Sequence, residues 1–471
     1  MRHFDLCVIG SGPAGQKAAI QAAKLGKRVV VVEKRQVVGG EAVNAGTIPS
    51  KALREAIVNL TGRPPAMPRY EDFTQARNET FENLLASCNR VITEEIDMIR
   101  QHFSRNGIEV VYGRGSFIEP NRIEIVGQTA KSTVTADKFL IATGSRPASA
   151  PRVDYDGTTI ISSDGLLKLA FLPHSIIVVG GGVIGTEYAS MLAALGVKVT
   201  IVEGRSRVLD FVDAEIIEAL QYHLRQSGVT LRLGEKVVKI ETIDAPAGSR
   251  TADNRMAQAT LESGKTLRAD CLLYAVGRQG STDGLGLEVV GIEADKRGRI
   301  EVNEHFQTKV GHVYAAGDVI GFPALASTSM EQGRLAACHM FGRPTTQVPE
   351  LLPYGIYAVP EISMVGWTEQ QLTDEGIPYE SGIAQYREIA RGQLLGDEIG
   401  MLKMLIHQET RHILGVHIIG TGATELVHIG QAAIAFKATV DYFVEAVFNY
   451  PTLAECYKVA ALNGVNKLLS V

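Results

Sequence analysis

The chain contains the same strand, glycine turn, helix and strand unit twice, and this repeat constrains its fold more than any other feature. The first copy reads DLCVIGSGPAGQKAAIQAAKLGKRVVVVEK and the second reads SIIVVGGGVIGTEYASMLAALGVKVTIVEG. In each copy an Ala-rich helix ends at Gly and the second β-rich run ends in Glu. The interval from Gly10 to Glu33 equals the interval from Gly180 to Glu203. Two such units with one spacing predict an α/β protein with two Rossmann-like domains.

The glycines of each unit stand where a dinucleotide site needs residues without a Cβ. The first allows a tight turn out of the strand, the second lets the backbone approach a pyrophosphate, and the third lets helix and strand pack closely. The pyrophosphate then lies at the helix N-terminus, where free N–H groups and the helix dipole favour an anion. The glutamate can accept hydrogen bonds from a ribose diol. These residues are Gly10, Gly12, Gly15 and Glu33 in the first unit, and Gly180, Gly182, Gly185 and Glu203 in the second.

Composition argues against several classes of function. The formal net charge is −5, with acidic and basic residues mixed along the chain, so we expect no nucleic acid as a partner. No apolar run reaches the roughly 18 residues of a membrane span, and the N-terminus begins with a strand-like run rather than a signal peptide. The widely spaced cysteines predict neither a disulfide framework nor a metal site, and they favour a reducing cytoplasm. They are Cys7, Cys88, Cys271, Cys338 and Cys456.

The sequence outside the two repeats predicts the division into domains. Residues 58–76 are polar and Pro-rich and predict a loop, whereas residues 77–106 have the apolar spacing of a helix. From about residue 346, the runs ISMVGW, MLKMLIH and ILGVHIIG alternate with helical stretches and predict an α+β domain. The predicted boundaries are 1–150 for a first domain, 151–278 for a second, 279–345 for a return to the first domain and 346–471 for the C-terminal domain.

Several motifs occur in the order that flavoprotein disulfide reductases have them. They are GSGPAG at 10–15, GG and GTIPSKAL within 39–53, ATGSRP at 142–147, GGGVIGTEYA at 180–189, AVGR at 275–278, YAAGDV at 314–319 and PTLAE at 451–455. Over essentially its whole length the chain therefore resembles the FAD-dependent pyridine nucleotide-disulfide oxidoreductase family. The resemblance implies an FAD-binding domain, an NAD(P)-binding domain and a C-terminal dimerisation domain, and hence a homodimer.

The resemblance also implies roles for individual residues. Lys51 would lie near flavin N5 and pair with Glu187, and its ammonium would modulate the potential of the ring. Asp318 would hydrogen-bond the ribityl chain of FAD. Without the motifs, Lys51 would be a solvated helix lysine and Asp318 a helix-starting residue. The other motif residues that we expect to contact FAD or the nucleotide are Gly40, Thr47, Thr143, Gly144, Gly277, Gly317 and Ala326.

The chain departs from the family at the residues that carry thiol chemistry. The family motif GG-x-C-x4-C-x-P-S-K is replaced by GGEAVNAGTIPSK, so Ala42 and Thr47 stand in the two cysteine positions. Neither side chain can form a thiolate, and we favour a helix N-cap role for Thr47. In the C-terminal motif, Tyr450 replaces the proton-shuttling His, while Glu455 is kept. A Tyr, with a pKa near about 10, is a poor base at neutral pH.

Two arginines and a valine near the second glycine turn bear on nucleotide choice. Glu203 suits the ribose diol of NAD(H) and would repel a 2′-phosphate. Arg205 and Arg207 follow it and could clamp the 2′-phosphate of NADP(H), or could be ordinary exposed loop arginines. We expect both nucleotides to be used. Val183 would be the side chain nearest the nicotinamide, unless it only packs.

These features predict a reaction in which electrons leave from the flavin itself. The favoured acceptor is a second nicotinamide nucleotide, so the reaction is NADPH + NAD⁺ ⇌ NADP⁺ + NADH, by ping-pong hydride transfer through FAD. The segments FNYPTLAE and GTIPSKAL resemble most the soluble transhydrogenase branch of the family, although that branch can keep a cysteine where Ala42 stands. One alternative is an NAD(P)H oxidase or quinone reductase of the same fold. Another is a non-catalytic redox-sensing flavoprotein, against which the retention of Lys51, Glu187 and both dinucleotide sites argues.

Overall fold

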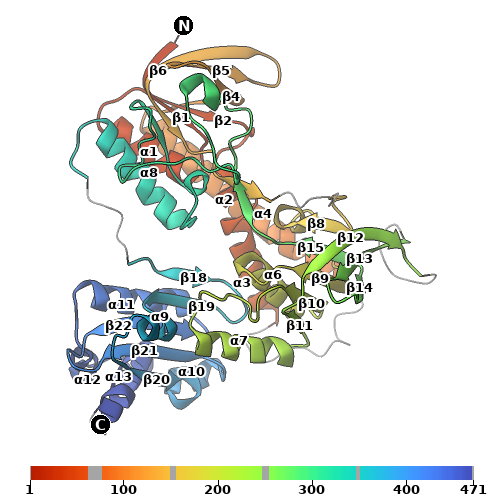
Figure 1. The fold of residues 1–471 in the computed structure, drawn as a ribbon, viewed down its shortest axis with the longest axis vertical. Coiled ribbons are helices and arrows are strands. Elements are labelled where there is room, and N and C mark those ends of the chain that lie inside the picture. Colours follow the sequence, from red (N-terminus) through yellow and green to blue (C-terminus); the bar gives the residue numbers. More distant parts are fainter. Residues whose placement is uncertain (1, 62–76, 149–154, 247–253, 346–350, 469–471) are drawn as a thin grey trace. The chain divides into compact units, whose positions relative to one another are not determined.

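The structure is a computed structural model that describes residues 2–61, 77–148, 155–246, 254–345 and 351–468 (Figure 1). The chain divides into two compact units. Unit 1 comprises Met1–Ala52, Leu85–Ser149 and Gly277–Pro349, and unit 2 comprises Leu53–Leu84, Ala150–Val276 and Glu350–Val471. This division by compactness differs from a division by motif, so the domain boundaries predicted from the sequence stay predictions.

Unit 1 is built on a seven-stranded sheet in the order β3-β2-β1-β6-β5-β4, with β17 also paired to β6. Strands β3, β2, β1, β6 and β17 run parallel, whereas β5 pairs antiparallel with both β4 and β6. Strand β2 and the C-terminal ends of β1 and β6 are apolar and buried, as expected where helices and loops cover both faces of a parallel sheet. The bounds are β1 Arg2–Ile9, β2 Val29–Glu33, β3 Glu109–Tyr112, β4 Arg114–Glu119, β5 Arg122–Val126, β6 Lys131–Ile141 and β17 Val313–Ala315.

Helices α1 and α8 lie side by side in unit 1 (Figure 1). Their contact is close because Gly333 of α8 has no side chain: a Cβ there would lie 2.1 Å from the carbonyl oxygen of Ala14. A short antiparallel pair, β7 with β16, completes the unit near the flavin-binding motifs. The bounds are α1 Pro13–Lys24, α2 Gly40–Asn44, β7 Ser145–Pro147, β16 Arg278–Gly280, η2 Leu287–Val290, η3 Asp318–Ile320 and α8 Ala326–Met340. Helices α3 (Thr47–Thr61) and α4 (Arg77–Arg105) contribute residues to both units.

The first part of unit 2 is a parallel sheet in the order β11-β10-β9-β15-β8. Helix α6 follows β9 and is buried from Gly185 to Ala194, including the polar side chains of Thr186, Glu187 and Ser190. A separate antiparallel sheet, β12-β13-β14, adjoins it. The bounds are β8 Ile160–Ser162, α5 Ser163–Leu166, β9 Ser175–Val179, α6 Val183–Ala194, β10 Lys198–Glu203, α7 Ala214–Gln226, β11 Thr230–Leu233, β12 Val237–Asp244, β13 Arg255–Leu261, β14 Thr266–Ala269 and β15 Cys271–Tyr274.

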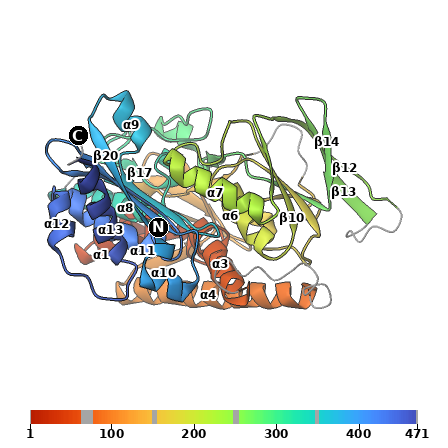
Figure 2. The same ribbon diagram turned by 90° about the horizontal axis from the view of Figure 1, so that it is seen from below.

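The C-terminal part of unit 2 is a five-stranded antiparallel sheet in the order β18-β19-β22-β21-β20. Helices α11 and α13 pack on it, and the Tyr457 hydroxyl joins them because it donates to Leu426 O and accepts from Gly430 N–H. Helix α7 contacts this sheet at β22, and Figure 2 shows α7 beside the blue strands of the sheet. The bounds are β18 Tyr354–Ile356, β19 Ile362–Gly366, α9 Glu369–Asp374, β20 Tyr379–Gln385, η4 Tyr386–Glu388, α10 Ala390–Leu395, β21 Met401–His407, β22 Ile413–Ile419, α11 Ala423–Ala435, α12 Val440–Glu445 and α13 Glu455–Leu468.

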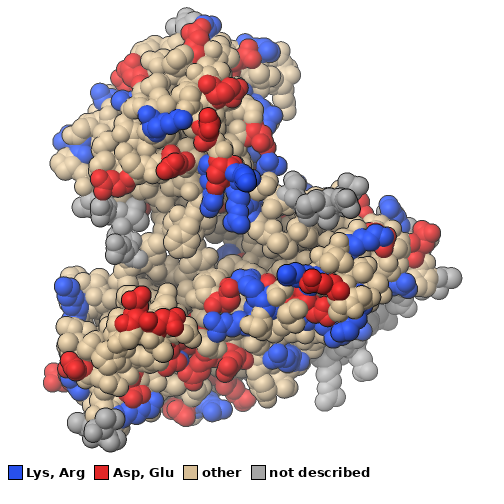
Figure 3. Space-filling view, viewed as in Figure 1, with Lys and Arg blue, Asp and Glu red and all other residues tan. Residues whose placement is uncertain are grey.

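The structure confirms the predicted fold class and most of the predicted elements. The helix expected at 77–106 is α4, and the three C-terminal β runs are β19, β21 and β22. The loop expected at 58–76 is wrong over its first residues, which continue α3 to Thr61, and the rest of it lies outside the described residues. Within the described ranges, no helix is long and apolar enough to cross a membrane. Acidic and basic side chains are interspersed on the face shown in Figure 3.

Candidate active site

The first glycine turn leaves open space at one glycine and packs tightly at the other two. A Cβ on Gly15 would lie 2.0 Å from Gly10 O, and a Cβ on Gly10 would lie 2.3 Å from Ala142 O. By contrast, a Cβ on Gly12 would have no atom within 4 Å. Gly12 is the N-cap of α1 and provides no side-chain cap, so the first N–H groups of this helix are available to a ligand.

Glu33 is fixed at the end of β2 by hydrogen bonds from this turn. Its Oε2 accepts from the N–H (3.0 Å) and the hydroxyl (2.6 Å) of Ser11, and its Oε1 accepts from the N–H of Arg35 (2.9 Å). The Ser11 hydroxyl also accepts from the N–H of Gly39, which joins the turn to α2. Sequence reasoning missed Ser11, although its place between the first two glycines of the motif was a usable signal.

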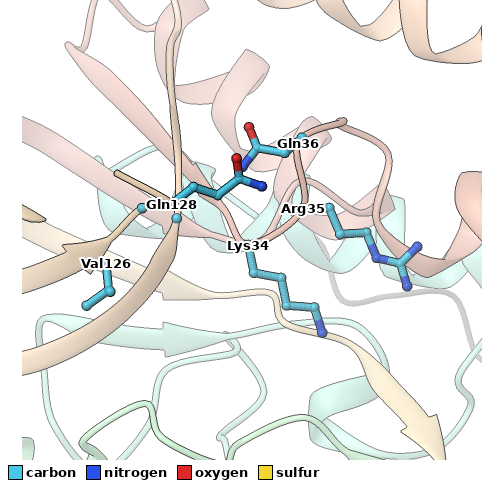
Figure 4. Close-up of a pocket in the computed structure, with 7 residues that line it drawn as sticks. Lys34, Arg35, Gln36, Val126 and Gln128 are labelled. Atoms are coloured by element: carbon cyan, nitrogen blue, oxygen red, sulfur yellow. The ribbon is translucent and has the colours of Figure 1, made fainter. Parts of the chain in front are cut away.

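A pocket of about 430 Å³ lies directly after Glu33 and was not foreseen (Figure 4). It is formed where β2, β3 and β5 end, which is the edge of a parallel sheet at which dinucleotides bind. Figure 4 shows Lys34, Arg35 and Gln36 leaving the end of β2, and Gln128 coming from the turn after β5. The remaining lining residues are Gly113, Val126 and Gly127. Its position suits the adenosine end of a dinucleotide held on α1.

The second glycine turn repeats the geometry of the first. A Cβ on Gly185 would lie 1.9 Å from Gly180 O, whereas a Cβ on Gly182 would have no atom within 4 Å. Gly182 is the N-cap of α6, and Val183 is the first residue of that helix. The structure therefore gives α6 the same open N-terminus as α1.

Glu203 occupies the position of Glu33 but has a different neighbour. Its Oε2 accepts from the N–H of Gly181 (2.7 Å), and its Oε1 accepts from the N–H of Arg205 (2.9 Å). The guanidinium of Arg205 also donates a bidentate pair of hydrogen bonds to Glu203, from Nε to Oε1 and from Nη2 to Oε2, each at 2.9 Å. Burial raises the pKa of Glu203, but the bonds from Arg205 and Gly181 outweigh it and hold the pKa below its usual range.

The loop after Glu203 brings both predicted arginines to one residue, Asp210. A third guanidinium nitrogen of Arg205, Nη1, donates to the Asp210 carboxylate, and Nη2 of Arg207 donates to the Asp210 carbonyl oxygen (2.9 Å). Arg205 and Asp210 are nearly half exposed, at 45% and 43% of their side chains. Asp210 is a second residue that sequence reasoning missed.

Lys51 lies on α3, next to the positions where the family has its redox cysteines. Its Nζ is 3.4 Å from the Ser50 hydroxyl. Ala42 lies on α2, and Thr47 is the first residue of α3. The N-cap role favoured for Thr47 is therefore wrong: the N–H of Ser50 donates to Gly46 O, so the helical bonds start from Gly46. Gly40 lies close to the first turn, because its Cβ would be 2.8 Å from Gly12 Cα.

Asp318 takes part in a chain of polar contacts within unit 1. Its Oδ2 accepts from the Ser145 hydroxyl (2.6 Å), which in turn accepts from Nε of Arg278 (2.7 Å). The N–H of the preceding Gly317 donates to the buried side chain of Gln332 (2.9 Å). Ser145, Arg278 and Gln332 were not predicted, because only folding brings these segments to Asp318. Gly277, the residue before Arg278, accepts the N–H of Ala148.

Glu187 lies on α6 and is almost fully buried, at 3% exposure. One of its oxygens accepts from the N–H of Tyr357 (2.8 Å). Because Glu187 and Lys51 belong to different units, their pairing stays a prediction. Tyr450 is 67% exposed, and Glu455, the first residue of α13, has one buried carboxylate oxygen without a partner among the described residues.

All five cysteines are free and buried. Burial raises the pKa of the Cys88 thiol to about 11 and that of Cys456 to about 12. It raises the pKa values of Cys7 and Cys271 further still. These four thiols stay protonated near neutral pH and cannot act as thiolate nucleophiles.

Comparison with known families assigns the class of protein that this fold and these sites define. Residues 4–333 match the model of the pyridine nucleotide-disulphide oxidoreductases, and residues 352–461 match the dimerisation domain of the same family. The chain belongs to the pyridine nucleotide-disulphide oxidoreductase family. It is a flavoprotein oxidoreductase that uses FAD and nicotinamide dinucleotides, and it forms a homodimer.

Individual relatives narrow the comparison. The soluble pyridine nucleotide transhydrogenase of Mycobacterium tuberculosis is 53% identical over 470 residues, which cover 99% of this chain and 98% of that protein. The protein of the same name from Yersinia enterocolitica is 46% identical over 472 residues, or 99% of each chain. Two solved structures share the fold. LpdA from Mycobacterium tuberculosis has a TM-score of 0.86 at 26% identity and covers 98% of this chain and 99% of its own. The HOCl-induced flavoprotein disulfide reductase RclA from Escherichia coli has a TM-score of 0.85 at 25% identity, with coverage of 97% and 99%.

The residues present in unit 1 fit FAD. The space at Gly12 admits a pyrophosphate at the N-terminus of α1, and the pocket beside Glu33 admits an adenosine group. The buried hydroxyl of Thr143, next to Gly144, has no hydrogen-bond partner among the described residues. A buried hydroxyl without a partner is costly, so this one points to a polar group that binds there.

Proposed function

We propose that this protein transfers hydride between NADPH and NAD⁺. The observation that carries the proposal is the combination of two dinucleotide turns of one geometry with Ala42 and Thr47 at the positions of the redox cysteines. With no thiol to receive electrons there, a second nucleotide at the turn from Gly180 to Gly185 is the acceptor that the chain is equipped to bind. The names of the curated relatives support the same activity.

The chain's own residues bind FAD and the nucleotides, orient them, and compensate the charge that develops during hydride transfer. Bound FAD supplies a two-electron carrier between donor and acceptor nucleotides. Lys51 would place a positive charge where negative charge develops. The expected pairing with Glu187, whose carboxylate accepts the Tyr357 N–H, would position that lysine. Gly10, Gly12, Gly15, Gly40, Thr47, Thr143, Gly144, Glu33, Gly317, Asp318 and Ala326 would hold FAD. Tyr450 and Glu455 would complete the flavin site of the partner subunit.

A single nucleotide site imposes the order of events. Gly180, Gly182, Gly185, Glu203 and Gly277 would bind whichever nucleotide is present, with residues 151–278 as the nucleotide domain. Donor and acceptor cannot occupy this site together, so the donor leaves before the acceptor enters. The kinetics are therefore ping-pong, with parallel lines in double-reciprocal plots.

The cytoplasm is the compartment that we assign to this enzyme. Five free cysteines suit a reducing environment, and the relatives are named soluble enzymes.

The decisive test is anaerobic rapid mixing of the purified homodimer. NADPH should bleach the flavin absorbance. After removal of excess donor, thio-NAD⁺ should restore the absorbance at a rate that accounts for turnover. Lipoamide and glutathione disulfide should be inactive as acceptors. If oxygen or a quinone restores the absorbance rapidly while nucleotides do so only slowly, the protein is an oxidase or quinone reductase instead.

A matched variant links the result to the second glycine turn. Gly182→Asp places a carboxylate in the open space of the pyrophosphate site, where no protein atom would clash with the first added carbon. This variant should keep bound FAD and should be reduced by dithionite, but thio-NAD⁺ should no longer reoxidise it. Reoxidation of the variant by thio-NAD⁺ at the wild-type rate would show that the acceptor uses another site.

A further inference from the structure

The two dinucleotide units differ in what they do with the arginine two residues after the conserved glutamate. In the first βαβ repeat, the Arg35 side chain pairs with Glu41. Glu33 accepts its hydrogen bonds from Ser11 in the glycine turn and from the backbone N–H of Arg35. In the second repeat, the Arg205 side chain grips Glu203 through Nε and Nη2. In the first βαβ repeat the hydrogen bonds to Glu33 come from uncharged groups, whereas in the second the carboxylate of Glu203 is paired with a guanidinium.

The hydrogen bonds that Glu203 accepts offset most of the negative charge that it would present to a further anion. A carboxylate offers about four acceptor positions. Two are taken by the N–H groups of Gly181 and Arg205, and two by the Arg205 guanidinium. Arg205 therefore cancels most of the repulsion that Glu203 alone would exert on a 2′-phosphate.

The ion pair between Nη1 of Arg205 and Asp210 is the contact that an anionic ligand can replace. Nη1 points to Asp210, and this ion pair is exposed on both sides, unlike the pair with Glu203, whose carboxylate side chain is only 8% exposed. Exposed ion pairs are weak and are readily exchanged for another anion. Arg207 also contacts Asp210, because its Nη2 donates a hydrogen bond to the carbonyl oxygen of that residue.

The loop holds Asp210 in a fixed position beside the glycine turn. The N–H of Leu209 donates to Gly181 O (2.9 Å), and Leu209 adopts a positive φ of 47° although it is not glycine. Leu209 is fully buried, which keeps the backbone in this unfavourable conformation. Three residues after Asp210, Asp213 caps α7 and closes the loop.

We propose that Asp210 sets the choice between NAD(H) and NADP(H) by competing with the 2′-phosphate for Nη1 of Arg205. With NAD(H), Asp210 stays on Nη1. With NADP(H), the 2′-phosphate replaces Asp210 on that nitrogen, while Nε and Nη2 keep Glu203 neutralised. The inference rests on the proposed function in one respect: both nucleotides use the turn at Gly180. It explains how a site with a strand-end glutamate accepts a phosphorylated ribose at all.

The test measures binding of two fragments that differ only in the phosphate, 2′,5′-ADP and 5′-AMP, to the FAD-loaded homodimer by calorimetry. Asp210→Asn removes one negative charge and frees Nη1, so 2′,5′-ADP should bind about twofold to fivefold more tightly, as expected for an exposed ion pair. Binding of 5′-AMP should not change. The gain should shrink as the ionic strength rises. Asp210→Glu, which restores the carboxylate, should return the affinity for 2′,5′-ADP to that of the wild type.

A double-mutant cycle separates competition for Arg205 from simple charge repulsion. In an Arg205→Ala background, Asp210→Asn should change the affinity for 2′,5′-ADP by less than about 1.5-fold, because the two residues then no longer couple. Asp441→Asn, which breaks the Arg411–Asp441 pair elsewhere in unit 2, is the matched control and should alter neither fragment. An equal gain in the Arg205→Ala background, or no gain in the wild-type background, overturns the proposal. Because fragment binding involves no electron transfer, this outcome is independent of whether the enzyme proves to be a transhydrogenase or a quinone reductase.

Discussion

At the scale of single residues, the second and third glycines of one motif have separable functions. Gly182 faces open space, whereas a Cβ on Gly185 would overlap Gly180 O at 1.9 Å. Gly185→Ala should therefore destabilise the packing of α6 on β9, by about 1–3 kcal/mol. Gly182→Ala should leave the Tm unchanged but weaken NADH and NADPH alike by about tenfold, since the methyl group enters the space of the pyrophosphate. Thermal unfolding and nucleotide titration of both variants check this, and a loss of stability in Gly182→Ala would contradict it.

Lys51 carries the second prediction at this scale. Lys51→Met removes the ammonium while keeping a chain of similar length, so FAD should stay bound. Both half-reactions, reduction by NADPH and reoxidation by thio-NAD⁺, should slow by about 100-fold, the cost of losing one preorganised charge at a reacting centre. Stopped-flow absorbance measures each half-reaction separately. Lys17→Met, which removes an exposed lysine of α1, is the control and should behave like the wild type. A variant that slows only one half-reaction would assign Lys51 to one nucleotide rather than to the flavin.

A site residue could be predicted from the sequence only where a short, continuous motif identifies it. The motif glycines and Glu33 were predicted because one short segment contains all the information. Ser145, Arg278 and Gln332 were missed because they reach Asp318 only through the packing of β7, β16 and α8. Thr47 was misassigned by one residue, since glycine caps helices without a side-chain signal. Asp210 was missed because acidic loop residues are usually solvated.

At the scale of elements, a buried ion network joins the nucleotide-binding part of unit 2 to its C-terminal sheet. Lys403 of β21 is fully buried and bonds Asp213 at the start of α7, Glu215 in the first turn of α7 and Glu369 of α9. The three carboxylates lie within 4.8 Å of one another, and the single positive charge of Lys403 offsets part of their mutual repulsion. No sequence pattern indicates this network. Of the elements that carry it, β21 was predicted from the run MLKMLIH.

Lys403→Met tests the network. The substitution leaves the buried Asp213 carboxylate without its cation, so the free energy of unfolding should fall by about 3–5 kcal/mol. Lys239→Met, which breaks an exposed pair with Glu241, should cost less than about 1 kcal/mol. Urea unfolding of both variants provides the comparison. A small effect at Lys403 would mean that Asp213 is protonated or hydrated in the native protein.

The same network predicts a dependence of stability on pH at both extremes. Burial opposes ionisation of Asp213, but His417 and Lys403 lower its pKa below the usual value, so its stabilising effect is lost as the pH falls below about 4. Burial lowers the pKa of Lys403, yet its carboxylate partners raise it above the usual value, so the ammonium's contribution is lost as the pH rises above about 10. In Lys403→Met the alkaline loss should disappear. The acid loss should become smaller, because without the ammonium the pKa of Asp213 in the folded protein is no longer held as far below its value in the unfolded chain.

At the scale of the whole molecule, the dimerisation domain leaves apolar side chains uncovered in the single chain. Val447 is 96% exposed and Tyr450 is 67% exposed, both in the segment between α12 and α13. Exposed apolar groups of this kind mark interfaces, and obligate dimers bury more than about 2,000 Å². This segment carries Tyr450 and leads directly into Glu455, the first residue of α13, and these two residues would complete the flavin site of the partner subunit.

Val447→Glu should therefore affect assembly and activity together. The carboxylate would be buried against an apolar partner surface, so dissociation should occur at protein concentrations where the wild type stays dimeric. The monomers should keep their fold but lose hydride transfer, because each flavin site then lacks its partner's segment. The fraction of dimer measured by sedimentation and the specific activity should decrease together as the protein is diluted. Tyr222→Glu changes an equally prominent side chain on α7 and should leave both unchanged. Full activity in monomeric Val447→Glu would show that one chain suffices for catalysis, and Tyr450 and Glu455 would then have no role in the partner's site.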